Sequence, residues 1–171
     1  NSQLISGTGL AGRWGLNEGS GTSAGNSIAG GALGTLVRNP LWVTGFNQTD
    51  PTTNSSLDFN GTEDYITFGA APGLNTPSGT FTVEAWIKIE GTGIATSTGT
   101  GGISGIPIVA KGRSESDAAG RNVNYFLGIN TSNVLVADFE ESGGANHPVT
   151  GTNAIPLNTW THVAATYGAG T

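Results

Sequence analysis

The stretch Phe81-Thr-Val-Glu-Ala-Trp-Ile-Lys-Ile-Glu90 decides the fold class, because apolar side chains alternate along it with mostly polar ones. The odd positions from 81 to 89 are all apolar, and the even positions hold Thr, Glu, Trp, Lys and Glu. A period of two is typical of a β-strand that turns one face toward a core. The same alternation runs through Trp160-Thr-His-Val-Ala-Ala-Thr-Tyr167. We therefore predict two strands, 81–90 and 160–167, that each bury one face.

Turn-forming residues separate further predicted strands. We place these strands at 12–16, 56–59, 65–68, 106–110, 125–129 and 134–139. Asn60-Gly61 predicts a hairpin that joins 57–59 to 65–68, and Thr131-Ser-Asn133 joins the last two strands. The Gly- and Thr-rich stretch 91–105 is predicted to be a long flexible loop. Many short strands with frequent turns indicate an all-β fold, an antiparallel sandwich or jelly roll.

Composition and charge exclude several classes of protein. The chain has 171 residues, which predicts one domain, and it has 29 Gly and no Cys. Charged residues make up only 11%, far below the ~25% of ordinary soluble domains, so an all-helical fold is excluded. No apolar run approaches the ~18 residues of a membrane-spanning helix. The net charge of −6 argues against a nucleic-acid partner, and the lack of Cys excludes disulfides and thiolate metal sites.

Catalytic constellations are weak. Glycoside hydrolysis needs two carboxylates ~5 to ~9.5 Å apart, whereas Glu84 and Glu90 on one strand are ~20 Å apart. Asp138 and Glu140, ~7 Å apart on one strand, are within range. We interpret them as solvated charges at a strand end, with a metal link or catalysis as the alternatives. The chain has only two His, which argues against a Ser-His-Asp triad.

Aromatic residues suggest a binding surface. Trp86 interrupts the polar face of its strand, and Trp160 precedes His162 by two residues on the other strand. An aromatic ring on an exposed sheet face can stack on a sugar ring, although such a ring is often covered by a loop or a neighbouring strand. We predict Trp86, Trp160 and His162 as ligand-binding residues.

A turn rich in oxygen ligands suggests a cation site. Asp58-Phe-Asn60-Gly-Thr62-Glu-Asp64 places oxygen-bearing side chains at alternate positions, and Ca²⁺ takes several such oxygens from a curved loop. We predict that Asp64 and Asn60, with Glu18 from a neighbouring loop, hold Ca²⁺. The alternative is a turn whose Asp and Asn side chains cap backbone amides.

Five motifs in order resemble those of laminin-G-like domains. They are Leu10-Ala-Gly-Arg-Trp-Gly-Leu-Asn-Glu-Gly-Ser-Gly-Thr22, Leu57-Asp-Phe-Asn-Gly-Thr-Glu-Asp-Tyr-Ile66, Phe81-Thr-Val-Glu-Ala-Trp-Ile-Lys88, Ile108-Val-Ala-Lys-Gly112 and Pro156-Leu-Asn-Thr-Trp-Thr-His-Val-Ala-Ala-Thr-Tyr167. The chain is thereby similar to the laminin-G/pentraxin-like branch of the concanavalin A-like lectin and glucanase superfamily. The resemblance implies a jelly roll of two antiparallel sheets, commonly with calcium at the rim and a role in binding.

The resemblance also implies what the chain does and where. The glucanase branch carries E-x-D-x-x-E, and Trp86 stands where its Asp would be, so no catalytic residue is carried over and we expect no enzyme. We expect a carbohydrate- or glycoprotein-binding module of a secreted or cell-surface bacterial protein. The alternatives are a structural spacer or adhesion module and, less favoured, a glycoside hydrolase fragment.

The family pattern continues with further strands after its "A-A-T-Y" strand. We therefore expect residues 1–171 to be a single laminin-G-like domain that is C-terminally incomplete. The expected partner is a set of complementary strands, supplied by a second polypeptide or by another copy. The glycine-rich residues 168–171 suit a cleavage site at a loop tip.

Overall fold

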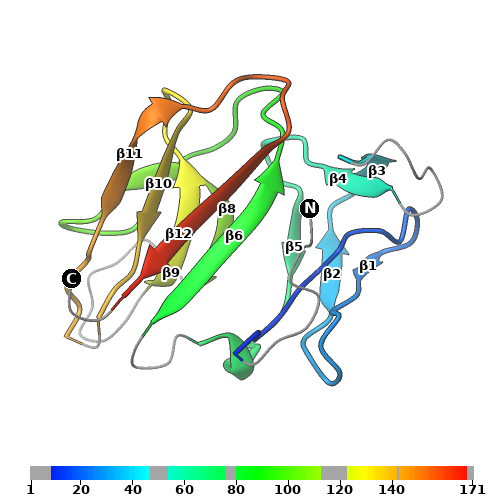
Figure 1. The fold of residues 1–171 in the computed structure, drawn as a ribbon, viewed down its shortest axis with the longest axis horizontal. Helices are drawn as coiled ribbons and strands as arrows, with labels where there is room; N and C mark the ends of the chain where they lie inside the picture. Colours follow the sequence, from blue (N-terminus) through cyan, green and yellow to red (C-terminus); the bar gives the residue numbers. More distant parts are fainter. Residues whose placement is uncertain (1–8, 47–53, 76–79, 113–122, 142, 169–171) are drawn as a thin grey trace. The chain divides into compact units, whose positions relative to one another are not determined.

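The regular structure of the chain is almost entirely β-strand (Figure 1). The computed structural model describes residues 9–46, 54–75, 80–112, 123–141 and 143–168. Its elements are β1 (Ser23–Ala24), β2 (Gly34–Val37), β3 (Leu41–Thr44), β4 (Ser55–Asp58), β5 (Tyr65–Thr67), the 3-10 helix η1 (Pro72–Leu74), β6 (Phe81–Ile87), β7 (Thr96–Ser97), β8 (Ser104–Gly112), β9 (Val123–Ile129), β10 (Val134–Asp138), β11 (Val149–Ala154) and β12 (Thr161–Tyr167). This inventory confirms the predicted all-β class. Among the described residues, no helix is long and apolar enough to cross a membrane.

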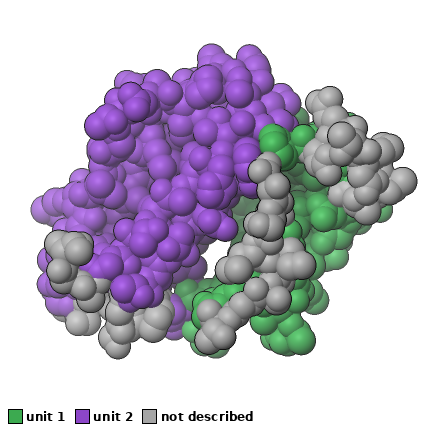
Figure 2. Space-filling view, in the orientation of Figure 1, with its two compact units in different colours: residues 1–74 green, residues 75–171 purple. Residues whose placement is uncertain are grey.

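The chain forms two compact units, residues 1–74 and residues 75–171, which Figure 2 shows in green and purple. The second unit contains a five-stranded antiparallel sheet with the order β11-β10-β9-β8-β7 and a two-stranded antiparallel sheet of β12 and β6. Residues of both sheets meet in one hydrophobic core, with Val163 of β12, Leu127 of β9 and Ala137 of β10 among its buried members. The second unit is therefore a two-layer β-sandwich.

The alternation of β6 and β12 explains this packing. Val163 lies opposite Ala85 and Ala165 opposite Val83, and all four pack in the core. Intervening residues of both strands, such as Thr82 and Thr166, are exposed. The five-stranded sheet has a second cluster, in which Phe126, Val136 and Val123 are buried.

The first unit consists of two small antiparallel sheets, β1-β2-β5 and β3-β4. Its tryptophans are held by backbone carbonyls: Trp14 Nε1 donates to Ala32 O at 2.9 Å, and Trp42 Nε1 donates to Gly21 O at 2.9 Å. The Trp14 ring also lies 4.4 Å, centroid to centroid, from that of Phe68. Side-chain hydrogen bonds thus anchor segments that have little strand structure of their own.

Three local predictions were wrong. The strands flanking Asn60-Gly61 do not pair with each other, because β4 pairs with β3 and β5 pairs with β2. The predicted strand 12–16 is reduced to an isolated bridge between Trp14 and Asn26. The predicted loop 91–105 contains β7, which pairs with the start of β8.

Other predicted strands are confirmed, with small changes at their ends. The strand predicted at 81–90 ends at Ile87, and the turn at 131–133 does join β9 to β10. Asn133 adopts a φ of 58° in this turn, a left-handed conformation that Asn tolerates better than most residues. Of the glycine-rich stretch 168–171, only Gly168 is described, and residues 169–171 lie outside the described residues. The expectation of complementary closing strands stays a prediction.

Candidate functional site

The outward face of β6 and β12 carries the predicted ligand-binding residues. The register places Trp86 opposite His162, Glu84 opposite Ala164, and Thr82 opposite Thr166. The hydroxyls of Thr82 and Thr166 lie 2.9 Å apart and share a hydrogen bond. Since the intervening residues of both strands point into the core, these side chains form one strip, which we call the β6–β12 outer face.

Trp86 and His162 form the centre of this face. Their ring centroids are 5.4 Å apart at an interplanar angle of 48°. His162 Nε2 lies 3.3 Å from Glu84 Oε2, and the Glu84 side chain is 59% exposed. The His162 imidazole therefore lies next to both the Trp86 ring and the accessible Glu84 carboxylate.

Lys88 follows Trp86 by two residues and Trp160 precedes His162 by two residues, so both extend the same face. The Lys88 ammonium lies 5.8 Å from the centroid of the Trp160 ring, within the range of a cation–π contact. Lys88 Nζ also forms an ion pair with Glu90. Trp86 and Trp160 are both half-buried. The structure thus brings the three predicted ligand-binding residues onto one face, with Trp160 beyond the Trp86–His162 pair.

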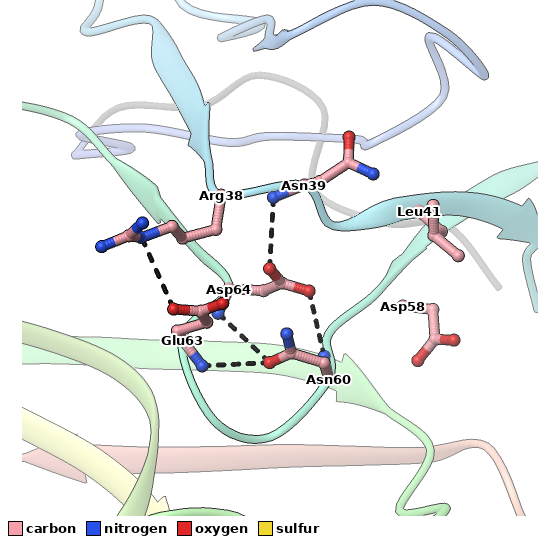
Figure 3. A pocket seen from close by; sticks show the side chains of 7 residues that line it. All are labelled: Arg38, Asn39, Leu41, Asp58, Asn60, Glu63 and Asp64. Atoms are coloured by element: carbon pink, nitrogen blue, oxygen red, sulfur yellow. Dashed lines mark hydrogen bonds and ion pairs between the residues drawn. The ribbon is translucent and has the colours of Figure 1, made fainter.

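The predicted calcium ligands Asn60 and Asp64 lie together in the turn that follows β4 (Figure 3). Asn60 Oδ1 accepts hydrogen bonds from the backbone N–H groups of Thr62, Glu63 and Asp64 at 2.9, 3.0 and 3.3 Å, and from the Thr62 hydroxyl at 2.9 Å. Asp64 accepts the N–H of Asn39 on Oδ1 and that of Asn60 on Oδ2, each at 3.2 Å. These contacts match the capping alternative.

A cavity of about 490 Å³ adjoins this turn. Its lining residues are Arg38, Asn39, Leu41, Asp58, Asn60, Glu63 and Asp64. Arg38 Nε lies 3.7 Å from Glu63 Oε2, as the dashed line in Figure 3 shows. The cavity therefore combines three carboxylates with one guanidinium.

Glu18, the third predicted calcium ligand, does not line this cavity, and its Oε1 accepts the Gly25 N–H at 2.7 Å. Asn60 Oδ1 faces four donors, which use the acceptor capacity of a carbonyl oxygen with two lone pairs. Among the described residues, no three His, Cys, Asp or Glu side chains are arranged to hold a metal ion. The three residues thus do not fit Ca²⁺ as they are arranged here, and calcium binding stays a prediction.

Asp138 and Glu140 are buried, at 4% and 2% exposed, so their interpretation as solvated charges was wrong. Asp138 Oδ1 accepts the His147 N–H at 2.9 Å, and Oδ2 accepts the Thr98 hydroxyl. Glu140 Oε2 accepts the Val123 N–H at 2.7 Å. Burial raises the pKa of the Asp138 carboxyl, and hydrogen bonds from Thr98 and the backbone lower it by a smaller amount. These carboxylates accept hydrogen bonds from backbone N–H groups of neighbouring segments, and they are too buried to contact a polymeric substrate.

The residues that bury Asp138 carried no signal in the sequence. Thr98 also accepts the Ile103 N–H at 2.7 Å, so its hydroxyl links Asp138 to the segment between β7 and β8. A Cβ atom on Gly102 would clash with Thr98 Oγ1 and would lie 2.9 Å from Asp138 Oδ2. Gly102 therefore allows the loop to pack directly on the carboxylate. A Thr and a Gly in a Gly/Thr-rich stretch give no indication of such a contact.

Comparison with known proteins supports the family suggested by the motifs. Residues 60–171, more than half of the chain, match a family model described as the concanavalin A-like lectin/glucanases superfamily. No curated protein is significantly similar to the chain. No solved structure is significantly similar to it either. With its two-layer antiparallel sandwich and this match, the chain belongs to the laminin-G-like family of the concanavalin A-like lectin/glucanases superfamily.

Proposed function

We propose that the chain is a non-catalytic binding module that recognises carbohydrate, free or on a glycoprotein, through the β6–β12 outer face. The observation that carries the proposal is the Trp86–His162 pair, 5.4 Å between centroids, beside an accessible Glu84 carboxylate. Membership of the superfamily supports a binding module in general. A role outside the cell, in a secreted or cell-surface protein, is part of the same proposal.

The chemistry of the face suits a sugar. The C–H face of a pyranose is apolar and can stack on an indole ring, while its hydroxyls need polar partners at the ring edge. The Glu84 carboxylate can accept hydrogen bonds from two or more sugar hydroxyls, and hydrogen bonds to a charged acceptor are stronger than those to a neutral one. The His162 imidazole and the hydroxyls of Thr82 and Thr166 can each donate and accept hydrogen bonds. The face thus offers a platform and a polar border on two rigid strands.

A glycan array followed by titration calorimetry tests the proposal. We expect the protein to bind at least one glycan class and the Trp86→Ala variant to lose that binding, because the platform is removed. Trp42→Ala is the matched control, since Trp42 is also half-buried but belongs to β3. Thermal melts of both variants check that they fold.

Three results would contradict the proposal. The first is glycan binding that Trp86→Ala leaves unchanged, which would move the site elsewhere. The second is hydrolysis in a panel of chromogenic glycosides, which would make the chain an enzyme. The third is binding to no glycan at all, which would favour the adhesion or spacer role.

A further inference from the structure

The charges of the β6–β12 outer face restrict the kind of glycan that it can accept. Glu84 lies on this face, and Glu90 adjoins it through its ion pair with Lys88; both glutamate side chains are exposed. Lys88 is the one lysine of the face and forms an ion pair with Glu90. His162 lies 3.3 Å from Glu84, so an imidazolium at this position would also face a carboxylate. Each potential cation of the face therefore has a carboxylate beside it.

This arrangement disfavours an anionic ligand in either state of His162. With a neutral His162 imidazole, the face has two carboxylates and one ammonium. With an imidazolium, it has two negative and two positive charges, arranged as the pairs Glu84–His162 and Glu90–Lys88. A carboxylate or sulfate on the glycan would have to displace Glu84 or Glu90 from its partner and then lie next to it. Like charges brought together at an interface are strongly unfavourable. Sugar hydroxyls, in contrast, donate to the same carboxylates without displacing them.

The shape of the face favours a linear chain. Four opposed pairs follow one another along the strands: Thr82 with Thr166, Glu84 with Ala164, Trp86 with His162, and Lys88 with Trp160. Successive pairs are two residues apart, so the strip is about 20 Å long, enough for several pyranose units. Ala164 is the smallest side chain of the strip and is exposed opposite Glu84.

We propose that the β6–β12 outer face selects an uncharged linear glycan and rejects the same chain when its sugar units carry carboxylates. This inference rests on the proposed function and names the class of glycan that the module binds. It follows from the pairing of Glu84 with His162 and of Glu90 with Lys88, and from the two ring platforms between them.

The test uses matched pairs of oligosaccharides. β-1,4-Mannohexaose and the β-1,4-mannuronate hexamer share linkage and ring configuration and differ at C6, where the second has carboxylates. Cellohexaose and the β-1,4-glucuronate hexamer form a second pair. Calorimetry at neutral pH and low salt measures the affinity for each oligosaccharide. In the pair whose neutral member binds, we expect the affinity for the uronate to be lower by about 10-fold or more. Half-molar salt should reduce this difference in affinity, because it screens the repulsion between the uronate carboxylates and those of Glu84 and Glu90.

The Glu90→Gln variant sharpens the result. It removes one carboxylate and leaves Lys88 without its ion-pair partner, and the Gln amide oxygen still accepts hydrogen bonds from sugar hydroxyls. We therefore expect the ratio of uronate affinity to neutral-oligosaccharide affinity to rise several-fold. Equal affinity of both members of a pair, or preference for the uronate, overturns the inference and leaves the proposed function standing. Binding of neither pair, together with a blank glycan array, overturns both.

Discussion

At the scale of single residues, Asp138 shows how a carboxylate can serve the fold instead of a ligand. Its side chain lies under the loop of Thr98 and accepts the His147 N–H, so two segments distant in sequence are held to one strand end. The sequence could indicate that Asp138 and Glu140 follow a strand. It could not indicate that the segment 98–103 packs on Asp138, because that contact depends on a threonine hydroxyl and on Gly102.

The raised pKa of Asp138 predicts a pH dependence of stability. In the pH range above the ordinary Asp value of about 3.9, the native state binds this proton more tightly than the unfolded state does. Protonated Asp138 therefore stabilises the fold at low pH, and this contribution is lost as the pH rises through the raised pKa. We expect the free energy of unfolding of the wild type, relative to Asp138→Asn, to fall as the pH rises across this range.

Urea unfolding at a series of pH values measures this difference. Other titrating groups are common to both proteins and cancel in the comparison. Asp58→Asn controls for the loss of one charge, since Asp58 is exposed. Parallel pH profiles for wild type and Asp138→Asn would show that burial does not shift this carboxyl.

Asn60 allows a direct comparison of capping with metal binding. Asn60→Ala removes the acceptor for three backbone amides, and we expect a loss of about 1 kcal/mol in stability. The loss should be the same in calcium and in chelator. Asn130→Ala is the matched control, because Asn130 Oδ1 accepts the N–H groups of Ser132 and Val134 in a similar turn. A loss found only in calcium would assign Asn60 to a metal site after all.

At the scale of elements, the strands of the second unit were the most predictable part of the molecule. The alternation in β6 and β12 identifies both strands and both faces, because one face must enter the core. The register of His162 opposite Trp86 is not readable from either strand alone. The turn at Asn60-Gly61 misled the prediction for a related reason. Turn residues favour a change of direction, but they do not determine which strand the chain pairs with afterwards.

The sandwich core predicts a clear contrast between two leucines. Leu127 of β9 is completely buried in the core, whereas Leu157 is exposed in the loop before β12. We expect Leu127→Ala to reduce the free energy of unfolding by about 2–5 kcal/mol and Leu157→Ala to change it by about 0.5 kcal/mol or less. Chemical denaturation checks both. Similar effects of the two substitutions would contradict the two-layer packing of the second unit.

At the scale of the whole molecule, burial is distributed unevenly between the two units. Of the buried apolar residues among those described, all except Ala24 and Pro40 belong to the unit of residues 75–171. Because buried apolar contacts resist local opening, the two units should differ in stability. We expect amide hydrogens of β9 and β10 to exchange much more slowly than those of β3 and β4. Hydrogen exchange with mass spectrometry measures this, and equal protection would contradict it.

The pairing of β6 with β12 has a consequence for how the protein is made. The hydrogen-bonded hydroxyls of Thr82 and Thr166 are 84 residues apart. At ~5 to ~20 residues per second, a ribosome needs about 4 to 17 seconds to add the intervening chain. During that interval the nascent β6 lacks β12, its partner among the described strands, and its apolar side is open to chaperones or to the wrong strand. The sugar-binding face that we propose is therefore incomplete until residues 161–167 have been synthesised.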